Sequence, residues 1–121
     1  MYARYLAEFF GTLVFVLAIV LTAQPLLIAG TFLAVILLSG PLGAGHINPA
    51  VTLAMIFNGD LPMSEAAPYI IAQVAGALSA VQLAKVLKAR MRVHGTAVQR
   101  RTPRRRPPCP ESQAGGHPLS A

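Results

Sequence analysis

Charged residues and cysteine are both scarce in this chain. Of its 121 residues 12% are charged, only 4 are acidic, and Cys109 is the single cysteine. A lone cysteine cannot build an internal disulfide framework. With 55% hydrophobic residues, the chain is also far more apolar than an average soluble domain. The composition therefore indicates a membrane protein and excludes a disulfide-stabilised secreted module.

The chain also lacks a recognisable catalytic set. Its histidines, His46, His94 and His117, are scattered, and no two carboxylates lie within one predicted element. We therefore expect a protein that is not an enzyme and that needs neither a metal nor a cofactor.

Basic residues are almost absent from the first two thirds of the chain. Only Arg4 precedes residue 85, and the other nine Lys and Arg lie between Lys85 and Arg106. This predicts a membrane domain over residues 1–90 and a basic, Pro/Arg-rich, disordered tail over residues 91–121. The tail suits anionic lipid headgroups, or it is an accidental sequence whose bias resembles GC-rich DNA read out of frame. Nucleic acid is not an expected partner, because no aromatic or folded motif accompanies the charge.

Three apolar runs are suited to cross a bilayer, which takes about 20 residues. They are Tyr5–Ala23, Pro25–Ser39 with an extension into Gly40–Leu42, and Ala66 to about Leu87. The first is too long for a signal-peptide core and contains a carboxylate, so we interpret it as a true span. Ser64 and Glu65 are suited to begin the third. We expect a multi-pass protein of the cell (inner or plasma) membrane, with the lipid bilayer as its surroundings.

A glycine-rich turn at Gly43–Gly45 leads into a much shorter apolar segment. Asn48 suits a helix cap, and Pro49 suits the first helical position because it has a fixed φ and no N–H. The sequence Asn58–Pro62 ends this helix after about two turns, too early to cross a bilayer. We therefore predict a re-entrant half-helix, whose irregular backbone must be buried in protein or line a watery cavity. The expected fold is an all-α membrane protein with three transmembrane helices and one such half-helix.

Polar residues inside the spans suggest what holds this turn. Glu8 and Thr12 are four residues apart and share a helix face. A carboxylate within a span is costly and usually has a partner, so Glu8 is either a buried acceptor for a polar loop or an interfacial residue near Arg4. Gln73 either lines a pore or, as we favour, hydrogen-bonds a neighbouring helix. Small residues every fourth position, Ala72, Gly76 and Ala80, permit close helix packing.

These motifs resemble the aquaporin (major intrinsic protein) family, in its N-terminal half only. Residues Ala7–Thr12 resemble the family's first-helix motif, His46–Leu53 match its Asn-Pro-Ala signature, and Pro68–Gln73 with Gly76 resemble its third helix. The likeness covers roughly residues 4–86, and the short first loop is similar to compact bacterial members. Pro41 departs from the pattern, since family members often have His there. The resemblance implies half of an inverted repeat whose two Asn-Pro-Ala motifs meet near the bilayer midplane.

The resemblance also implies roles for individual residues. Asn48 would donate a hydrogen bond to water or a polyol hydroxyl, and Pro49 and Ala50 would pack against the partner motif. Glu8 and Gln73 would support the pore loop, and Ile28 would stand at a constriction that is wider or more apolar than in water-selective members. The backbone carbonyls that would form an acceptor ladder along the pore belong to Gly43, Ala44, Gly45 and His46.

The second half of the family's fold is missing from this sequence, which has neither a second Asn-Pro-Ala nor a matching pore arginine. One hypothesis is a channel component that passes water or small neutral solutes such as glycerol after an antiparallel homodimer, or another half-channel, supplies the rest. The alternative is a truncated or frameshifted membrane fragment that does not conduct. Charge and resemblance disagree on orientation: the family has its N-terminus in the cytoplasm, whereas the positive-inside rule puts the basic tail there.

Overall fold

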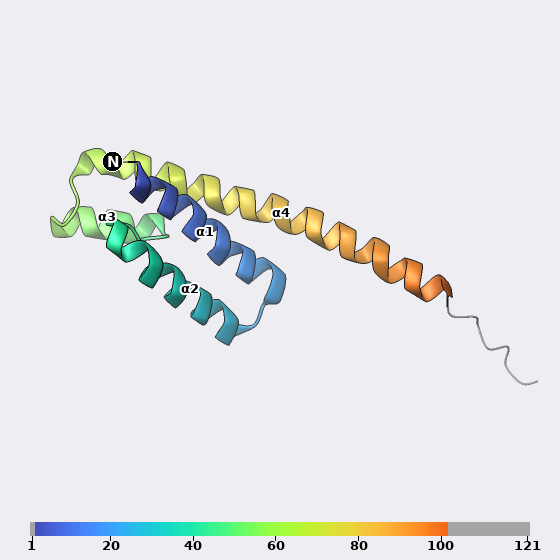
Figure 1. The fold of residues 1–121 in the computed structure, drawn as a ribbon. Coiled ribbons are helices and arrows are strands. Elements are labelled where there is room, and N and C mark those ends of the chain that lie inside the picture. Colours follow the sequence, from blue (N-terminus) through green and yellow to red (C-terminus); the bar gives the residue numbers. More distant parts are fainter. Residues whose placement is uncertain (1, 102–121) are drawn as a thin grey trace, which may run out of the picture.

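The computed structural model describes residues 2–101, with side chains described for residues 2–92, and this part of the chain is built from helices (Figure 1). Three segments are long and apolar enough to cross a membrane, Ala3–Thr22, Pro25–Leu42 and Met63–Arg92, and a shorter apolar helix accompanies them. The predicted all-α architecture with three spans and one short helix is therefore confirmed. In chain order the elements are α1 (Ala3–Thr22), α2 (Pro25–Ser39), η1 (Gly40–Leu42), α3 (Pro49–Asn58), η2 (Met63–Glu65) and α4 (Ala66–Arg101).

Helix α1 lies between α2 and α4 and packs against both (Figure 1). Helices α1 and α4 run parallel, because early residues of α1 contact the beginning of α4 and late residues contact later ones. Arg4 binds Glu65 in η2, just before α4, Glu8 binds Gln73, and Val20 binds Lys88. Helix α2 returns alongside α1 after a link of two residues. Pro25 at the first position of α2 fixes where that helix begins.

The α1–α4 interface is close because of small residues. A Cβ added at Gly76 would collide with the backbone carbonyl of Phe9, so only glycine allows this approach. One turn and two turns further on, Ala80 and Ala84 are fully buried. The α1–α2 interface is looser and borders an open apolar pocket of about 290 Å³. The polar residues discussed below therefore lie on the tightly packed side of α1.

Helix α3 is the short helix, and it enters the molecule through its N-terminus. Its 10 residues correspond to about 15 Å, half of a bilayer's hydrocarbon core. Asn48 caps its start, and Gly59 ends it in a left-handed conformation. The start of α3 faces α1 and α4, while its end leads back to the side of the molecule where η2 begins (Figure 1). This is the geometry expected for a re-entrant segment.

Helix α4 continues to Arg101, because a run of Lys and Arg changes solvation without breaking a helix. The division into a membrane domain over residues 1–90 and a disordered tail over residues 91–121 stays a prediction. The rest of the predicted tail, residues 102–121, lies outside the described residues. At the other end, Pro62 and not Ser64 is the cap of η2, and the Glu65 carboxylate binds Arg4 and Tyr5 instead of the helix start.

Candidate functional site

The Glu8 carboxylate organises the segment between η1 and α3. Glu8 is fully buried on α1. Its Oε1 accepts hydrogen bonds from the backbone N–H groups of Gly45, at 2.6 Å, and His46, at 2.8 Å. Its Oε2 accepts from the N–H of Ile47, at 2.7 Å, and from Nε2 of Gln73, at 2.8 Å. Four donors match the four lone-pair sites of an ionised carboxylate, which explains how this charge is accommodated inside a span.

These bonds determine where the carbonyl groups of the same segment point. In a trans peptide the C=O and the following N–H lie in one plane and point in opposite directions. Since the N–H groups of Gly45, His46 and Ile47 point at Glu8, the preceding carbonyls point away from it. Within the described residues no donor contacts these three carbonyls, which belong to Ala44, Gly45 and His46. The segment therefore has one bonded side and one row of open acceptors.

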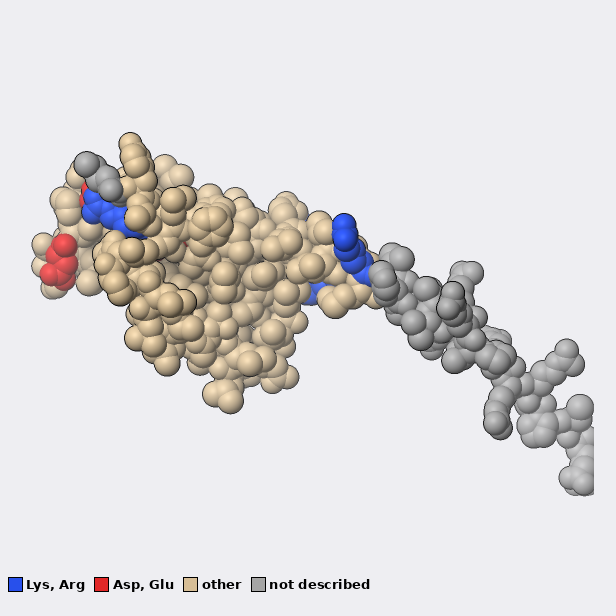
Figure 2. Space-filling model, viewed as in Figure 1, with Lys and Arg blue, Asp and Glu red and all other residues tan. Residues whose placement is uncertain are grey.

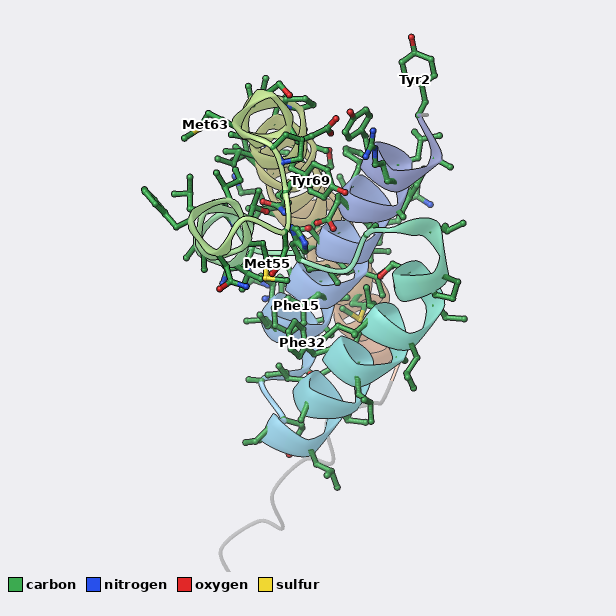
Figure 3. All side chains as sticks on the ribbon, turned by 90° about the vertical axis from the view of Figure 1, so that its left-hand side faces the viewer. Tyr2, Phe15, Phe32, Met55, Met63 and Tyr69 are labelled. Carbon is green, nitrogen blue, oxygen red and sulfur yellow. The ribbon has the colours of Figure 1, made fainter. Side chains whose placement is uncertain are left out.

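Gly43, the fourth carbonyl of the predicted row, is in a different situation. Its oxygen accepts a hydrogen bond from the Tyr69 hydroxyl, at 2.6 Å. Tyr69 projects from α4 towards α1 and the loop (Figure 3), and its ring packs against the His46 ring with centroids 5.0 Å apart. Tyr69 thus anchors the beginning of the loop, as Glu8 anchors its end.

Asn48 has two different amide atoms in two different roles. Its Oδ1 accepts from the N–H of Ala50, at 2.9 Å, and so caps α3. Its Nδ2 has no acceptor within the described part of the chain, and the residue is exposed. Asn48 and Pro49 line a cavity of about 280 Å³. The other residues that line this cavity are Thr12, Phe15, Val16, Ile47, Gln73, Val74 and Ala77.

Gln73 connects the carboxylate to the half-helix. Its Nε2 donates both to Glu8 and to Oγ1 of Thr52, the latter at 2.9 Å. Thr52 is fully buried in the second turn of α3. Its hydroxyl lies 3.3 Å from the Asn48 carbonyl oxygen and 3.2 Å from Nδ1 of His46, and its one hydrogen can be donated to either. The network therefore links α1, α4, the loop and α3.

Ile47 has a backbone conformation that a β-branched residue rarely adopts. Its φ is +52°, in the left-handed region. The bond from its N–H to Glu8 holds this conformation, and so does the burial of its side chain, which is 4% exposed and lies beside Gly11. Such strain is typical of sites where the fold imposes a particular backbone direction. Here the turn at Ile47 directs the chain from the loop into Asn48.

Comparison with known proteins assigns the chain to a family. The family model described as "Major intrinsic protein" matches residues 1–105. The chain belongs to the major intrinsic protein family. The resemblance predicted from the sequence is therefore confirmed.

Individual relatives of this family match part of the chain. A glycerol uptake facilitator protein-like 6 of Lactiplantibacillus plantarum is 40% identical over 64% of this chain and 40% of its own length. An aquaglyceroporin of Rhizobium meliloti is 36% identical over 58% of this chain and 30% of its own. Aquaporin Z of Brucella melitensis is 36% identical over 67% of this chain and 42% of its own. The chain thus spans less than half the length of these relatives, and no solved structure matches it significantly.

Ile28 lies apart from the other residues that the sequence predicts to line a pore. It is half-buried in the first turn of α2, where its N–H binds the Gln24 carbonyl. Ser39, at the loop end of α2, is roughly 16 Å further along the helix. Ile28 does not line the cavity at Asn48. Its place at a constriction stays a prediction.

Sequence reasoning gave no role to Thr52 or Tyr69, although both contact the site. The signal for Tyr69 was available: Tyr69, Gln73, Gly76 and Ala80 follow helical spacing and mark one face of α4. Within the described residues, no group of three or more His, Cys, Asp or Glu could hold a metal ion. The open hydrogen-bonding groups of the site are the backbone carbonyls of Ala44, Gly45 and His46 and the side-chain amide of Asn48.

Proposed function

We propose that this chain is one half of a membrane channel that passes water or small neutral solutes such as glycerol and that catalyses no reaction. The observation that carries the proposal is the row of open acceptors at Ala44, Gly45 and His46, followed by the open donor Asn48 Nδ2. Acceptors and donors in a line can replace the hydrogen bonds that a hydroxyl loses on leaving water. The names of the relatives, which include aquaporins and a glycerol uptake facilitator, support the same class of solute.

The start of α3 adds selectivity to this pathway. A helix N-terminus carries a partial positive charge, and Asn48 presents a donor beside it. Both oppose the passage of cations and protons and orient a water so that its oxygen faces Asn48. The pore-lining residues in this proposal are Gly43, Ala44, Gly45, His46, Asn48, Pro49 and Ala50, with Ile28 at a constriction. Glu8 and Gln73 support the loop and do not touch the solute.

The same open groups argue that the chain does not work alone. Unpaired backbone carbonyls cannot face lipid, since each unsatisfied group there costs several kcal/mol. Another polypeptide must therefore cover this side. Helix α3 also leaves an apolar stripe exposed beside the open groups, at Ala50, Leu53 and Phe57. We propose that a second copy in the opposite membrane orientation, or another half-channel, completes the pore in the cell membrane.

The alternative is a fragment that inserts in the membrane but does not conduct. Stopped-flow swelling of proteoliposomes made from the purified chain separates the two. Permeability to water or glycerol above that of empty liposomes is expected for the channel component. Permeability equal to that of empty liposomes would contradict conduction by this chain alone. If the DNA after codon ~90, read in its other frames, encodes a second Asn-Pro-Ala and further apolar runs, the fragment is the better description.

A substitution at Asn48 tests the residue itself. In Asn48→Asp the Oδ1 that caps α3 is kept, but the donor Nδ2 is replaced by an acceptor. Loss of one hydrogen bond to the solute should lower permeability about tenfold while the fold is retained. Gln24→Glu makes the same chemical change in the exposed α1–α2 link and should leave permeability unchanged. Equal flux through the two variants would refute the role of Asn48 as a donor.

A further inference from the structure

The half-helix α3 has an asparagine at each end, and these are the only asparagines in the sequence, Asn48 and Asn58. Asn48 precedes Pro49, whose nitrogen carries no hydrogen and so cannot attack a neighbouring side-chain amide. Asn58 precedes Gly59, whose nitrogen is the least hindered because glycine has no side chain. Asn58 can therefore lose its amide by reaction with the next backbone nitrogen, whereas Asn48 cannot.

The C-terminal end of α3 is open to solvent. Asn58, Gly59 and Asp60 are all exposed, and a Cβ added to Gly59 would meet no atom of the protein within 4 Å. The link that follows leads to η2, where Glu65 binds Arg4, so this end of α3 lies at the polar boundary of the spans. Figure 2 shows acidic atoms on the surface at the end of the molecule where α3 ends. Water, which the loss of an amide consumes, therefore reaches this turn.

Two hydrogen bonds restrain the groups that would react. The Gly59 N–H donates to the Ile56 carbonyl oxygen, at 3.1 Å, and Asn58 Nδ2 donates to Asp60 Oδ2, at 2.6 Å. The Asp60 carboxylate also opposes loss of the Gly59 proton, since a nearby negative charge disfavours a second one. Both bonds lie in an exposed last turn, where helices fray, so they slow the reaction without preventing it.

We propose that Asn58 is a site of spontaneous deamidation and that its bond to Asp60 limits the rate. The Gly59 nitrogen loses its proton to base and bonds to the side-chain carbonyl carbon of Asn58. The bond from that carbon to Nδ2 breaks, and Nδ2 leaves as ammonia with a proton taken from water. Water then adds to either carbonyl carbon of the cyclic imide and breaks its bond to the Gly59 nitrogen, which regains a proton. The product carries an aspartyl or isoaspartyl residue at position 58 and one more negative charge.

The new charge would act on one end of the half-helix. A negative charge near the C-terminal end of a helix is unfavourable, and here repulsion from Asp60 would replace a hydrogen bond. The start of α3 is held separately, because Thr52 in its second turn binds Gln73 on α4. We therefore expect the last turn of α3 to fray while Asn48 keeps its place. The proposal goes beyond channel function, because it needs neither a second copy nor conduction.

The test follows both asparagines in one sample. The purified full chain is kept in detergent in a mildly alkaline buffer made with heavy-oxygen water, and its peptides are analysed by mass spectrometry at intervals. We expect conversion at position 58 with uptake of heavy oxygen, and none at Asn48. A free peptide with the sequence of residues 53–61 supplies the rate without the fold. If position 58 stays unconverted in the full chain while the peptide is fully converted, the proposal is overturned.

Asp60→Ala tests the part that Asp60 plays. This variant lacks both the hydrogen bond and the charge, so position 58 should convert about fivefold faster, as expected for the loss of one exposed hydrogen bond. Glu65→Gln removes a nearby carboxylate that binds Arg4 and Tyr5, and it should leave the rate unchanged. An equal or slower rate in Asp60→Ala would overturn the role of Asp60.

Helix content is compared in all variants, because unfolding would also accelerate conversion. If Asp60→Ala loses helix content, Asp60→Glu supplies the comparison, since it keeps the charge at this position. Asp60→Glu with the helix content of the unaltered chain should convert at nearly the rate of the unaltered chain. Conversion of Asp60→Glu as fast as that of the free peptide would show that a carboxylate at this position does not restrain Asn58.

Discussion

The same residues of the loop before α3 form two sides that differ in hydrogen bonding and in burial. One side presents three N–H groups, and all three are bonded to Glu8 at 2.6–2.8 Å. The other side presents three carbonyls from the same peptide units, and none has a donor within the described residues. The bonded side is buried against α1 and α4, whereas the open side adjoins the surface where Asn48 is exposed.

The hydrogen bonds of the bonded side therefore determine where the carbonyls of the open side point. Because a peptide group is rigid, fixing the N–H of one residue fixes the direction of the preceding carbonyl. Glu8 can therefore aim three carbonyls without contacting them. Substitutions that disturb the bonded side should also disorder the open side, and the size of the effect should follow the number of donors that each change affects.

The largest effect is expected for Glu8→Gln. An amide in this place would have only one oxygen for four donors, and its NH₂ would face N–H groups. Hydrogen bonds to a buried charge contribute about 1.5–3 kcal/mol each, so the free energy of unfolding in detergent should fall by about 3 kcal/mol or more. Amide hydrogen exchange at Gly45, His46 and Ile47 should accelerate together. Glu65→Gln is the matched control: it removes the charge of a half-buried carboxylate that binds only Arg4 and Tyr5 within the described residues, and it should destabilise the fold less than Glu8→Gln. Equal destabilisation by both changes would contradict the central position of Glu8.

Gly76→Ala tests whether the bonded side depends on the distance between α1 and α4. The added methyl group collides with the Phe9 backbone and must push α4 away from α1, which lengthens the bond from Gln73 to Glu8. Overpacking of this kind costs about 1–3 kcal/mol. Gly30→Ala makes the same change where no atom lies within 4 Å, and it should be neutral or slightly stabilising. The measurement is thermal unfolding of both variants in the same detergent. If Gly76→Ala is as stable as Gly30→Ala, the bonded side does not depend on the distance between α1 and α4.

The smallest effect is expected for Tyr69→Phe. This change removes only the hydroxyl that donates to Gly43, and it keeps the ring that packs on His46. Single hydrogen bonds within membrane helices contribute about 0.6 kcal/mol on average. The stability should therefore drop slightly, and exchange at Gly45 to Ile47 should be nearly unchanged. If Tyr69→Phe accelerates that exchange as much as Glu8→Gln does, the two anchors of the loop are not independent.

The sequence predicted the helix boundaries well where proline, glycine or capping residues mark them. Pro25 and Ser39 bound the second helix, and Pro49 and Asn58 bound the half-helix, as predicted from proline, glycine and capping residues. Helix α4 continues past the change from apolar to basic residues, so this change does not mark a helix boundary. Prolines and glycines restrict the backbone directly, whereas charge only changes the preferred solvent.

The partners across the site were only partly predictable. A buried Glu8 implied some set of donors, but nothing local showed that they would be three successive N–H groups and Gln73. The positive φ of Ile47 contradicts the preference of a β-branched residue, so local propensity argued against the observed turn. Such contacts depend on how closely α4 approaches α1, which is a property of the packed molecule.

The parallel course of α1 and α4 has a consequence for joining copies of this chain. If each of the three helices that are long and apolar enough to cross a membrane does so, the beginning of α1 and the end of α4 lie on opposite faces. A second copy encoded directly after the first would therefore start on the far face and thread in the reverse direction, with no additional span in the linker. Duplication of a unit with an odd number of crossings therefore gives two copies in opposite membrane orientations. A tandem fusion of this chain would yield such a pair, related by a two-fold axis, in one polypeptide.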